Sequence, residues 1–474
     1  MKTKQKNICH ACRRGKISCD AKKPSCSQCS FKGIECPGYP ADWVFIPHNA
    51  RKAKTRHPVA RREPPGPKEA RREGNSGPSS TSAVISLRDL MLTIASSYVP
   101  EPEPIACANS VEPSPRICGS WVEVLPDLVD NDTNTALASA IKAFAVAILS
   151  RGPKPSTPEK AALEAYTEAL ASVNSALRSS YDSFPVEIAA AVMCLLLAEL
   201  FVPTRLDSWV AHLQGLGGLM ELSRPEFYIS GIPHRLFIGA RPSLIVLSFL
   251  SRKSSFLARK EWTTIPFRET PPSPVHELMS EAAVIPSILE MLDTNSRDDL
   301  IQKALEEFEA VLARLDLWGD AFLSRASSPL FWFKPPKNGG RQHIWYQNIT
   351  AANALTHLWA FRIICLRNID RLRAGAAPGY SPEPMSLEET KRLAVMICQS
   401  TEYLLQDKMR LFGPTSVILP LRIALDTFEA GGIRSKEELD WCNAMIADIF
   451  DRGYQFIALF FNVESGKRGV GSAG

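Results

Sequence analysis

Six cysteines between Cys9 and Cys36 constrain this chain more than any other feature of its 474 residues. They follow the spacing Cys-x2-Cys-x6-Cys, repeated once at an offset of 17 residues. They are Cys9, Cys12, Cys19, Cys26, Cys29 and Cys36. A structural zinc ion takes four ligands, whereas each half of the repeat offers three thiols. Six thiolates can therefore hold two zinc ions if one thiolate from each half bridges both metals.

The symmetric choice of bridges is Cys9 and Cys26, because each stands first in its half. One zinc is then held by Cys9, Cys12, Cys19 and Cys26, and the other by Cys26, Cys29, Cys36 and Cys9. The alternatives are a disulfide knot or cysteines scattered through a core. The chain opens with Met1-Lys2-Thr3-Lys4 rather than with an apolar signal peptide, so we expect a reducing compartment and bound metal. Because zinc binds thiolates, the segment is expected to be unfolded without it.

The residues between the cysteines resemble a known DNA-binding family. Arg13-Arg14-Gly15-Lys16 follows Cys12, Asp20 follows Cys19, and Lys23-Pro24 precedes Cys26. This pattern is similar to that of the fungal binuclear zinc cluster transcription factors. The resemblance implies two zinc ions per chain, binding to double-stranded DNA and a location in the nucleus. It also implies a regulator of RNA polymerase II genes, for example of a pathway or a secondary-metabolite gene cluster.

The resemblance assigns the base-reading role to Lys16, four residues after the second cysteine. In that family, the end of the first helix enters the major groove at a CGG-type triplet. A lysine there can donate to guanine O6 and N7, and free carbonyls at the helix end can accept from cytosine. Phosphate contacts are expected from Arg13, Arg14, Lys22, Lys23 and Lys32. Family members usually carry a basic residue where Gly15 stands, so we expect weaker and less salt-sensitive binding.

Charge is distributed as in many nucleic-acid-binding proteins. Residues 1–73 contain 18 Lys and Arg against 6 Asp and Glu, whereas the remainder contains 37 against 44. We expect a zinc cluster at 1–40 and a basic, Pro- and Ser-rich, largely disordered linker at 41–120. A helical regulatory domain at 121–461 and a flexible tail at 462–474 complete the expected organisation.

The linker contains one segment, 82–97, with helical periodicity. Val84, Leu87, Met91 and Ile94 follow the 3-4-3 spacing of a coiled-coil seam. Two heptads are fewer than a confident coiled-coil assignment needs. The segment is therefore either a helix that docks on the same chain or a homodimer contact.

From Trp121 onward, apolar periodicity predicts helices, so the fold class is expected to be mainly α with an all-α C-terminal domain. One helix face should contain Leu163, Tyr166, Leu170, Val173 and Leu177. Further helices are expected at 243–258, 275–293, 298–325, 345–373, 386–411, 414–430 and 435–461. This order of helices is similar to the regulatory region of many fungal zinc cluster proteins. That likeness implies co-regulators or the transcription machinery as partners.

The sequence gives little support to membrane proteins or enzymes. The longest apolar run, Ile188 to Ala198, has 11 residues and is predicted to be a core helix. No metalloprotease, nucleophile-elbow or phosphate-loop motif is found, and His212 is expected to be a structural histidine. Two functions remain: a sequence-specific transcription regulator, or a zinc-stapled scaffold that binds only proteins. No small-molecule effector can be identified from the sequence.

Overall fold

The computed structural model describes residues 12, 19–20, 22, 26–33, 86–102, 117–129, 135–152, 154–179, 186–294, 298–335, 341–376, 384–431 and 435–461. The chain divides into two compact units, within residues 1–52 and 53–474. The expected linker segment 41–85 and the tail 462–474 lie outside the described residues.

Helices account for most of the described residues of the large unit. The small unit contains α2 (Ser27–Phe31). The first part of the large unit contains α3 (Leu87–Tyr98), η1 (Cys118–Val124), α4 (Leu125–Leu128), α5 (Thr135–Leu149), α6 (Glu159–Ser179), α7 (Val186–Ala198), α8 (Leu206–Leu222) and η2 (Pro225–Tyr228). Its middle contains α9 (Gly231–Ser251), η3 (Phe256–Ala258), α10 (Lys260–Thr264), η4 (Ile265–Phe267), α11 (Pro274–Ala282) and α12 (Ile285–Thr294). Its last part contains α13 (Asp298–Arg325), β1 (Phe331–Lys334), β2 (His343–Tyr346), α14 (Ile349–Ala376), α15 (Pro384–Leu404), η6 (Asp407–Met409), α16 (Phe412–Gly431), α17 (Lys436–Asp451) and α18 (Phe456–Phe460). The expectation of a mainly α fold is confirmed.

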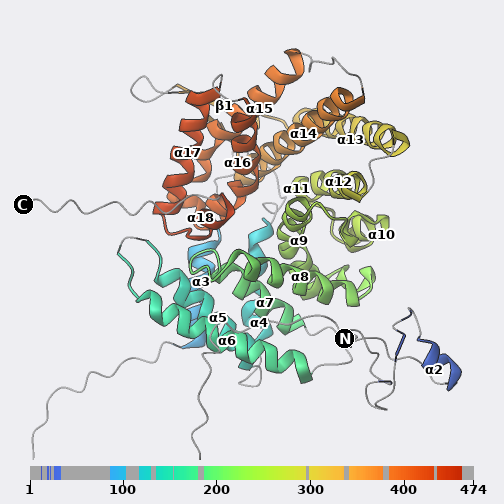
Figure 1. Ribbon diagram of the computed structural model, residues 1–474. Coiled ribbons are helices and arrows are strands. Elements are labelled where there is room, and N and C mark those ends of the chain that lie inside the picture. Colours follow the sequence, from blue (N-terminus) through green and yellow to red (C-terminus); the bar gives the residue numbers. More distant parts are fainter. Residues whose placement is uncertain are drawn as a thin grey trace, which may run out of the picture. The chain divides into compact units, whose positions relative to one another are not determined.

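The large unit has one continuous apolar core, because its last helices return to its first ones (Figure 1). The rings of Tyr98 and Phe412 meet edge to face with centroids 6.0 Å apart. The rings of Trp209 and Phe456 lie 5.0 Å apart, and Phe456 N–H donates to the Leu200 carbonyl. The N-terminal and C-terminal helices of this unit therefore fold against each other.

Helix α3 occupies the segment whose role the sequence left open. Ser86 caps it by accepting a hydrogen bond from Asp89 N–H at 3.2 Å. Leu90, Ile94 and Tyr98 are buried, and Leu87 and Met91 pack against the same core. The side chains of the expected seam that the structure describes thus face this chain's own body, as in a docking helix.

Helix α6 buries most of the expected face. Tyr166 and Val173 are buried, and Leu170 and Leu177 pack against the core, but Leu163 is 39% exposed. The buried face also contains Ala162, Ala165 and Ala169, which the prediction did not include. Small side chains at these positions allow α5 and α7 to approach α6 closely.

Helix α9 corrects the predicted boundaries of 243–258. It begins at Gly231, continues through Pro242 and ends before Arg252, whose φ is +50°. A proline usually ends a helical pattern, which explains the displaced start. A Cβ at Gly239 would lie 2.6 Å from the Trp121 ring, so glycine permits the contact between α9 and η1.

Two other predicted helices are each divided into two helices in the structure. The range 275–293 contains α11 and α12, and Pro286 stands in the first turn of α12. The range 435–461 contains α17 and α18, separated by Gly453 with a φ of +95°.

A short antiparallel hairpin was not predicted. Phe331 of β1 pairs with Tyr346 of β2, and Lys334 pairs with His343. Each strand has four residues, too few for alternation to be recognised beside long helices. The helix expected at 345–373 begins later, at Ile349, where the Asn348 side chain accepts from Ala351 N–H at 2.9 Å.

One helix within the described residues, α14, is long and apolar enough by length and composition alone to cross a membrane. Its most apolar stretch is 89% buried inside the body, as in a core helix. The predicted core helix at Ile188–Ala198 is confirmed, since every residue of it is buried within α7.

Candidate metal centre

The small unit is built around α2, a helix of only five residues. Its N-cap is Cys26, whose Sγ accepts a hydrogen bond from Cys29 N–H at 3.4 Å. Its end is marked by Lys32, whose N–H donates to the Gln28 carbonyl, and by Gly33 with a φ of +65°. A helix this short is unstable by itself in water, so other contacts must hold it.

Asp20 supplies one of those contacts. Its Oδ1 accepts from Ser27 N–H at 3.0 Å and its Oδ2 accepts from the Ser27 hydroxyl at 2.6 Å. The hydrogen bond from the Ser27 hydroxyl lowers the pKa of the Asp20 carboxyl below its ordinary value. The carboxylate therefore anchors the first turn of α2 to the residue that directly follows Cys19.

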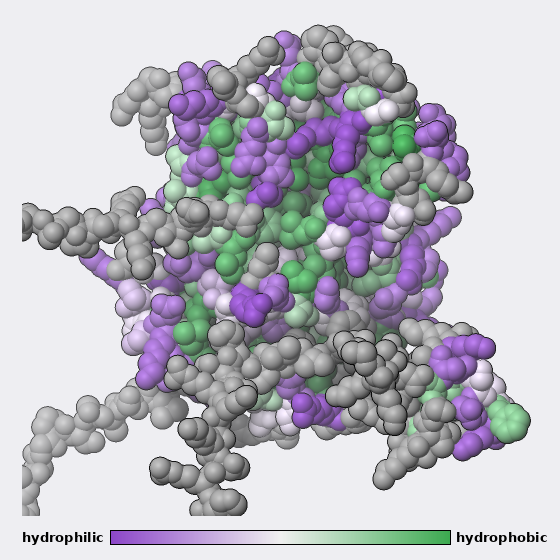
Figure 2. Space-filling view, in the orientation of Figure 1, coloured by the Kyte–Doolittle hydropathy of each residue, from purple (hydrophilic) through white to green (hydrophobic). Residues whose placement is uncertain are grey.

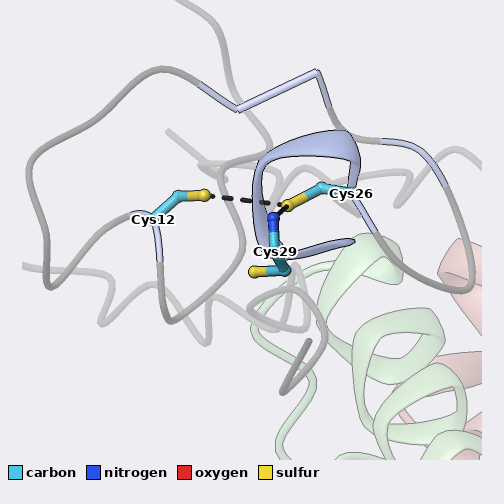
Figure 3. A group of neighbouring side chains, drawn as sticks. All are labelled: Cys12, Cys26 and Cys29. Carbon is cyan, nitrogen blue, oxygen red and sulfur yellow. Dashed lines mark hydrogen bonds between the residues drawn. The ribbon is translucent and has the colours of Figure 1, made fainter. Parts of the chain in front are cut away.

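Thiols supply the remaining contacts. The Sγ atoms of Cys12 and Cys26 lie 3.7 Å apart, and both belong to a buried group with the Sγ of Cys29 in which every pair of sulfur atoms is within 4.8 Å (Figure 3). A tetrahedral zinc with Zn–S bonds of about 2.3 Å places its sulfurs about 3.8 Å apart. A disulfide would need about 2.05 Å. The spacing therefore fits a shared zinc ion and not a disulfide between these two residues.

A second group shares one of these thiols. The ligand atoms of Cys19, Asp20 and Cys26 also lie within 4.8 Å of one another. Cys26 thus belongs to both groups, and its Sγ lies within 4.8 Å of the Sγ atoms of Cys12, Cys19 and Cys29. This is the arrangement that a thiolate bridging two metal ions requires.

Several predicted site residues lie outside the described residues. They are Cys9, Cys36, Lys16, Arg13, Arg14 and Lys23. Of the predicted phosphate contacts, the structure describes Lys22 and Lys32. Both are exposed, and Lys22 Nζ lies 3.9 Å from Asp20 Oδ2. Both side chains are therefore accessible to a polyanion.

Sequence reasoning missed two residues of this unit. Asp20 was recognised only as part of a motif, although its placement directly after Cys19 puts its carboxylate beside the start of α2. Phe31 is 90% exposed at the end of α2, where an apolar side chain is unexpected. No spacing rule in the sequence distinguishes Phe31 from a core residue.

The large unit contains a buried polar network around His212. The Tyr166 hydroxyl lies 2.6 Å from His212 Nε2 and donates to Glu199 Oε1 at 2.6 Å. Glu199 also accepts from the N–H and hydroxyl of Thr204. Burial lowers the pKa of His212 to about 4 and raises the pKa of Glu199. These contacts tie α6, α7 and α8 together, as expected of a structural histidine.

Comparison with known proteins identifies the N-terminal segment. Residues 8–42 match the family described as Fungal Zn(2)-Cys(6) binuclear cluster domain. The segment is also similar to "Transcriptional regulator dmxR14" of Cryptosporiopsis sp. (strain 8999), with 49% identity over 35 residues. That match covers 7% of this chain and 8% of the relative. No solved structure matches the chain. The family description specifies two zinc ions and six cysteines, so zinc is the metal of this centre and two ions are bound.

Proposed function

Residues 8–42 form a fungal Zn(2)-Cys(6) binuclear cluster domain, and on this premise we propose that the protein is a nuclear transcription factor that binds double-stranded DNA. The observation that carries the proposal is the place of Cys26 in both thiol groups. It ties the matched segment to the geometry of a two-zinc cluster. A cluster of this kind presents a short helix on a small rigid unit, as reading of a DNA groove requires.

We propose the full ligand set from the repeat. Cys9, Cys12, Cys19 and Cys26 hold one zinc, and Cys26, Cys29, Cys36 and Cys9 hold the other. The described thiols of Cys12, Cys19 and Cys29 all lie within 4.8 Å of the Cys26 thiol, which supports Cys26 as a bridge. The repeat supports Cys9 as the second bridge, because it corresponds to Cys26.

The repeat also supports Lys16 as the residue that reads bases. The offset of 17 residues maps Lys16 onto Gly33, which follows the C-cap of α2. We therefore infer that Lys16 follows the end of the helix in the first half, next to carbonyl groups that have no partner within that helix. Lysine and carbonyls at one helix end can address guanine and cytosine of a CGG-type triplet. Arg13, Arg14, Lys22, Lys23 and Lys32 would hold phosphates.

The helical body would regulate transcription of RNA polymerase II genes through co-regulators or the transcription machinery, without an enzymatic activity. A pathway or a secondary-metabolite gene cluster is the proposed target. Ile94 is buried in the core of the large unit, so it cannot also lie in the seam of a coiled coil between two copies of α3. We therefore place any homodimer contact outside that helix face.

The test is a titration of Lys16→Met against a CGG-type duplex and a scrambled duplex. Methionine keeps an unbranched side chain but cannot donate. Binding to the CGG-type duplex should fall roughly tenfold to a hundredfold, since a good base contact discriminates by about 1–3 kcal/mol. Binding to the scrambled duplex should change far less.

Arg14→Gln is the matched control. It should weaken binding to both duplexes similarly and reduce the slope of log affinity against log salt by about one. Equal losses on both duplexes for Lys16→Met would make Lys16 a phosphate contact. No zinc-dependent DNA binding at all would favour the protein-only scaffold, which a gel shift with and without a chelator distinguishes.

A further inference from the structure

A cavity of about 120 Å³ lies within the large unit, where its first and last helices meet. Its wall is mostly apolar and includes Leu200, Trp209, Val246, Met279, Phe412 and Phe456. In Figure 2, apolar residues likewise gather near the middle of the visible face of this unit. Protein interiors contain few voids larger than a water molecule. A dry apolar cavity of about 150 Å³ is known to hold benzene, so this one is of the size of a single ring.

Two polar side chains of α14 interrupt the apolar wall. Asn353 is 5% exposed, and its buried Oδ1 has no hydrogen-bond partner within the described part of the chain. His357, one helical turn further on, places Nδ1 2.8 Å from the Asn353 carbonyl oxygen. Because a carbonyl can only accept, Nδ1 carries the hydrogen and Nε2 is left as an acceptor. Burial lowers the pKa of His357 to about 4, so the imidazole is neutral at pH 7.

The lack of charged side chains in the cavity wall favours a neutral ligand. The residues that line the cavity include no Asp, Glu, Lys or Arg. An ionised molecule would lose its hydration there without gaining an opposite charge. A hydroxyl can donate to one polar group and accept from another, and would donate to the Asn353 Oδ1 that the described residues leave without a partner.

From the cavity, the amide and the imidazole together, we propose that the large unit binds a neutral apolar molecule of about single-ring size with one hydroxyl or similar hydrogen-bonding group. The molecule would contact α3, α7 and α8 as well as α14, α16 and α18. A ligand held between these elements stabilises the folded body. The inference goes beyond DNA binding and does not depend on it.

The test is calorimetric titration of the zinc-loaded full chain with phenol, benzene and benzoate. Phenol should bind saturably at one molecule per chain, about tenfold more tightly than benzene, because only phenol pairs with the amide. Benzoate should not bind measurably. Asn353→Leu removes the amide at similar volume and should abolish the preference for phenol over benzene.

Asn368→Leu is the matched control on the same helix. Its side chain donates to the Ile364 carbonyl at 2.8 Å and does not line this cavity. It should leave the phenol preference unchanged. Ser243→Leu, in the cavity wall, adds volume and should weaken the binding of both phenol and benzene. This variant keeps the proposal testable if Asn353→Leu fails to fold.

Non-saturable phenol binding, or equal binding of phenol and benzene by the wild-type chain, would overturn the proposal. So would phenol binding that survives Ser243→Leu unchanged. Calorimetry measures the small molecule directly, so these results are separate from the outcome of the DNA titrations.

Discussion

The two units of this chain are stabilised in opposite ways. In the small unit, the described helix α2 has five residues, one of them buried, and is held by Asp20 and a group of thiols. In the large unit, helices of up to 28 residues are stabilised by a continuous apolar core. Metal binding replaces hydrophobic burial where the chain is too short to build a core.

The proposed DNA-binding segment and most of the chain's residues therefore belong to different units. The segment for which DNA binding is proposed lies within residues 8–42, whereas most of the chain forms the helical body. Loss of metal should therefore abolish DNA binding without unfolding the body. Damage to the body's core should cost stability without changing the zinc content.

Zinc removal should have the largest effect. Chelation leaves the thiols of Cys12, Cys26 and Cys29 without the two ions proposed to hold them together, so specific DNA binding should disappear completely. Far-ultraviolet circular dichroism should keep almost all of its helical signal, because the metal-ligand groups found among the described residues lie in the small unit. A body that collapses on chelation would contradict the division into two independently stabilised units.

Cys194→Ala provides the control for that experiment. This thiol is fully buried in α7 of the large unit, far along the sequence from the repeat. The variant should retain two zinc ions and zinc-dependent DNA binding. Loss of zinc from it would mean that the body also holds the metal.

The next effect concerns α3, which the sequence assigned to a linker. Ile94 has no exposed surface, so Ile94→Ala should destabilise the body by about 2–5 kcal/mol. Leu92 is 60% exposed on the same helix, and Leu92→Ala should cost far less. Urea unfolding of both variants measures the difference. Equal effects would show that α3 does not belong to the core of the large unit.

The smallest of these effects depends on pH. Burial lowers the pKa of His357 to about 4, against about 6.5 in an unfolded chain. As the pH falls from 6.5 towards 4, the unfolded chain takes up this proton and the folded chain does not, so stability decreases. Lowering the pH from 7 to 5 should reduce the free energy of unfolding by about 2 kcal/mol through this residue.

His357→Asn tests the sign of that effect. Asparagine keeps an N–H near the position of Nδ1 but does not titrate. Urea unfolding at pH 7 and pH 5 should show a smaller loss of stability in the variant than in the wild-type chain. An equal loss in both would mean that His357 is accessible to protons in the folded state.

The sequence predicted the features that depend on residue spacing and periodicity. The repeat of thiols predicted a centre with two zinc ions, and periodicity predicted α7 and most of the other helices. Boundaries failed where tertiary packing overrode local preference. Pro242 lies inside α9, alanines join the core face of α6 whereas Leu163 is exposed, and the four-residue strands depend on pairing with each other. The anchoring role of Asp20 and the cavity beside Asn353 depend on contacts that no local pattern encodes.

The most direct test of the central claim is the zinc content of the full chain by native mass spectrometry. The wild-type chain should carry two zinc ions. Cys12→Ala removes a ligand from one metal and should retain one ion, whereas Cys26→Ala removes one of the two proposed bridges, leaves both ions with three thiolates and should retain none. A wild-type chain with a single zinc, or with disulfides among the six cysteines, would contradict the two-zinc cluster and the DNA-reading function proposed from it.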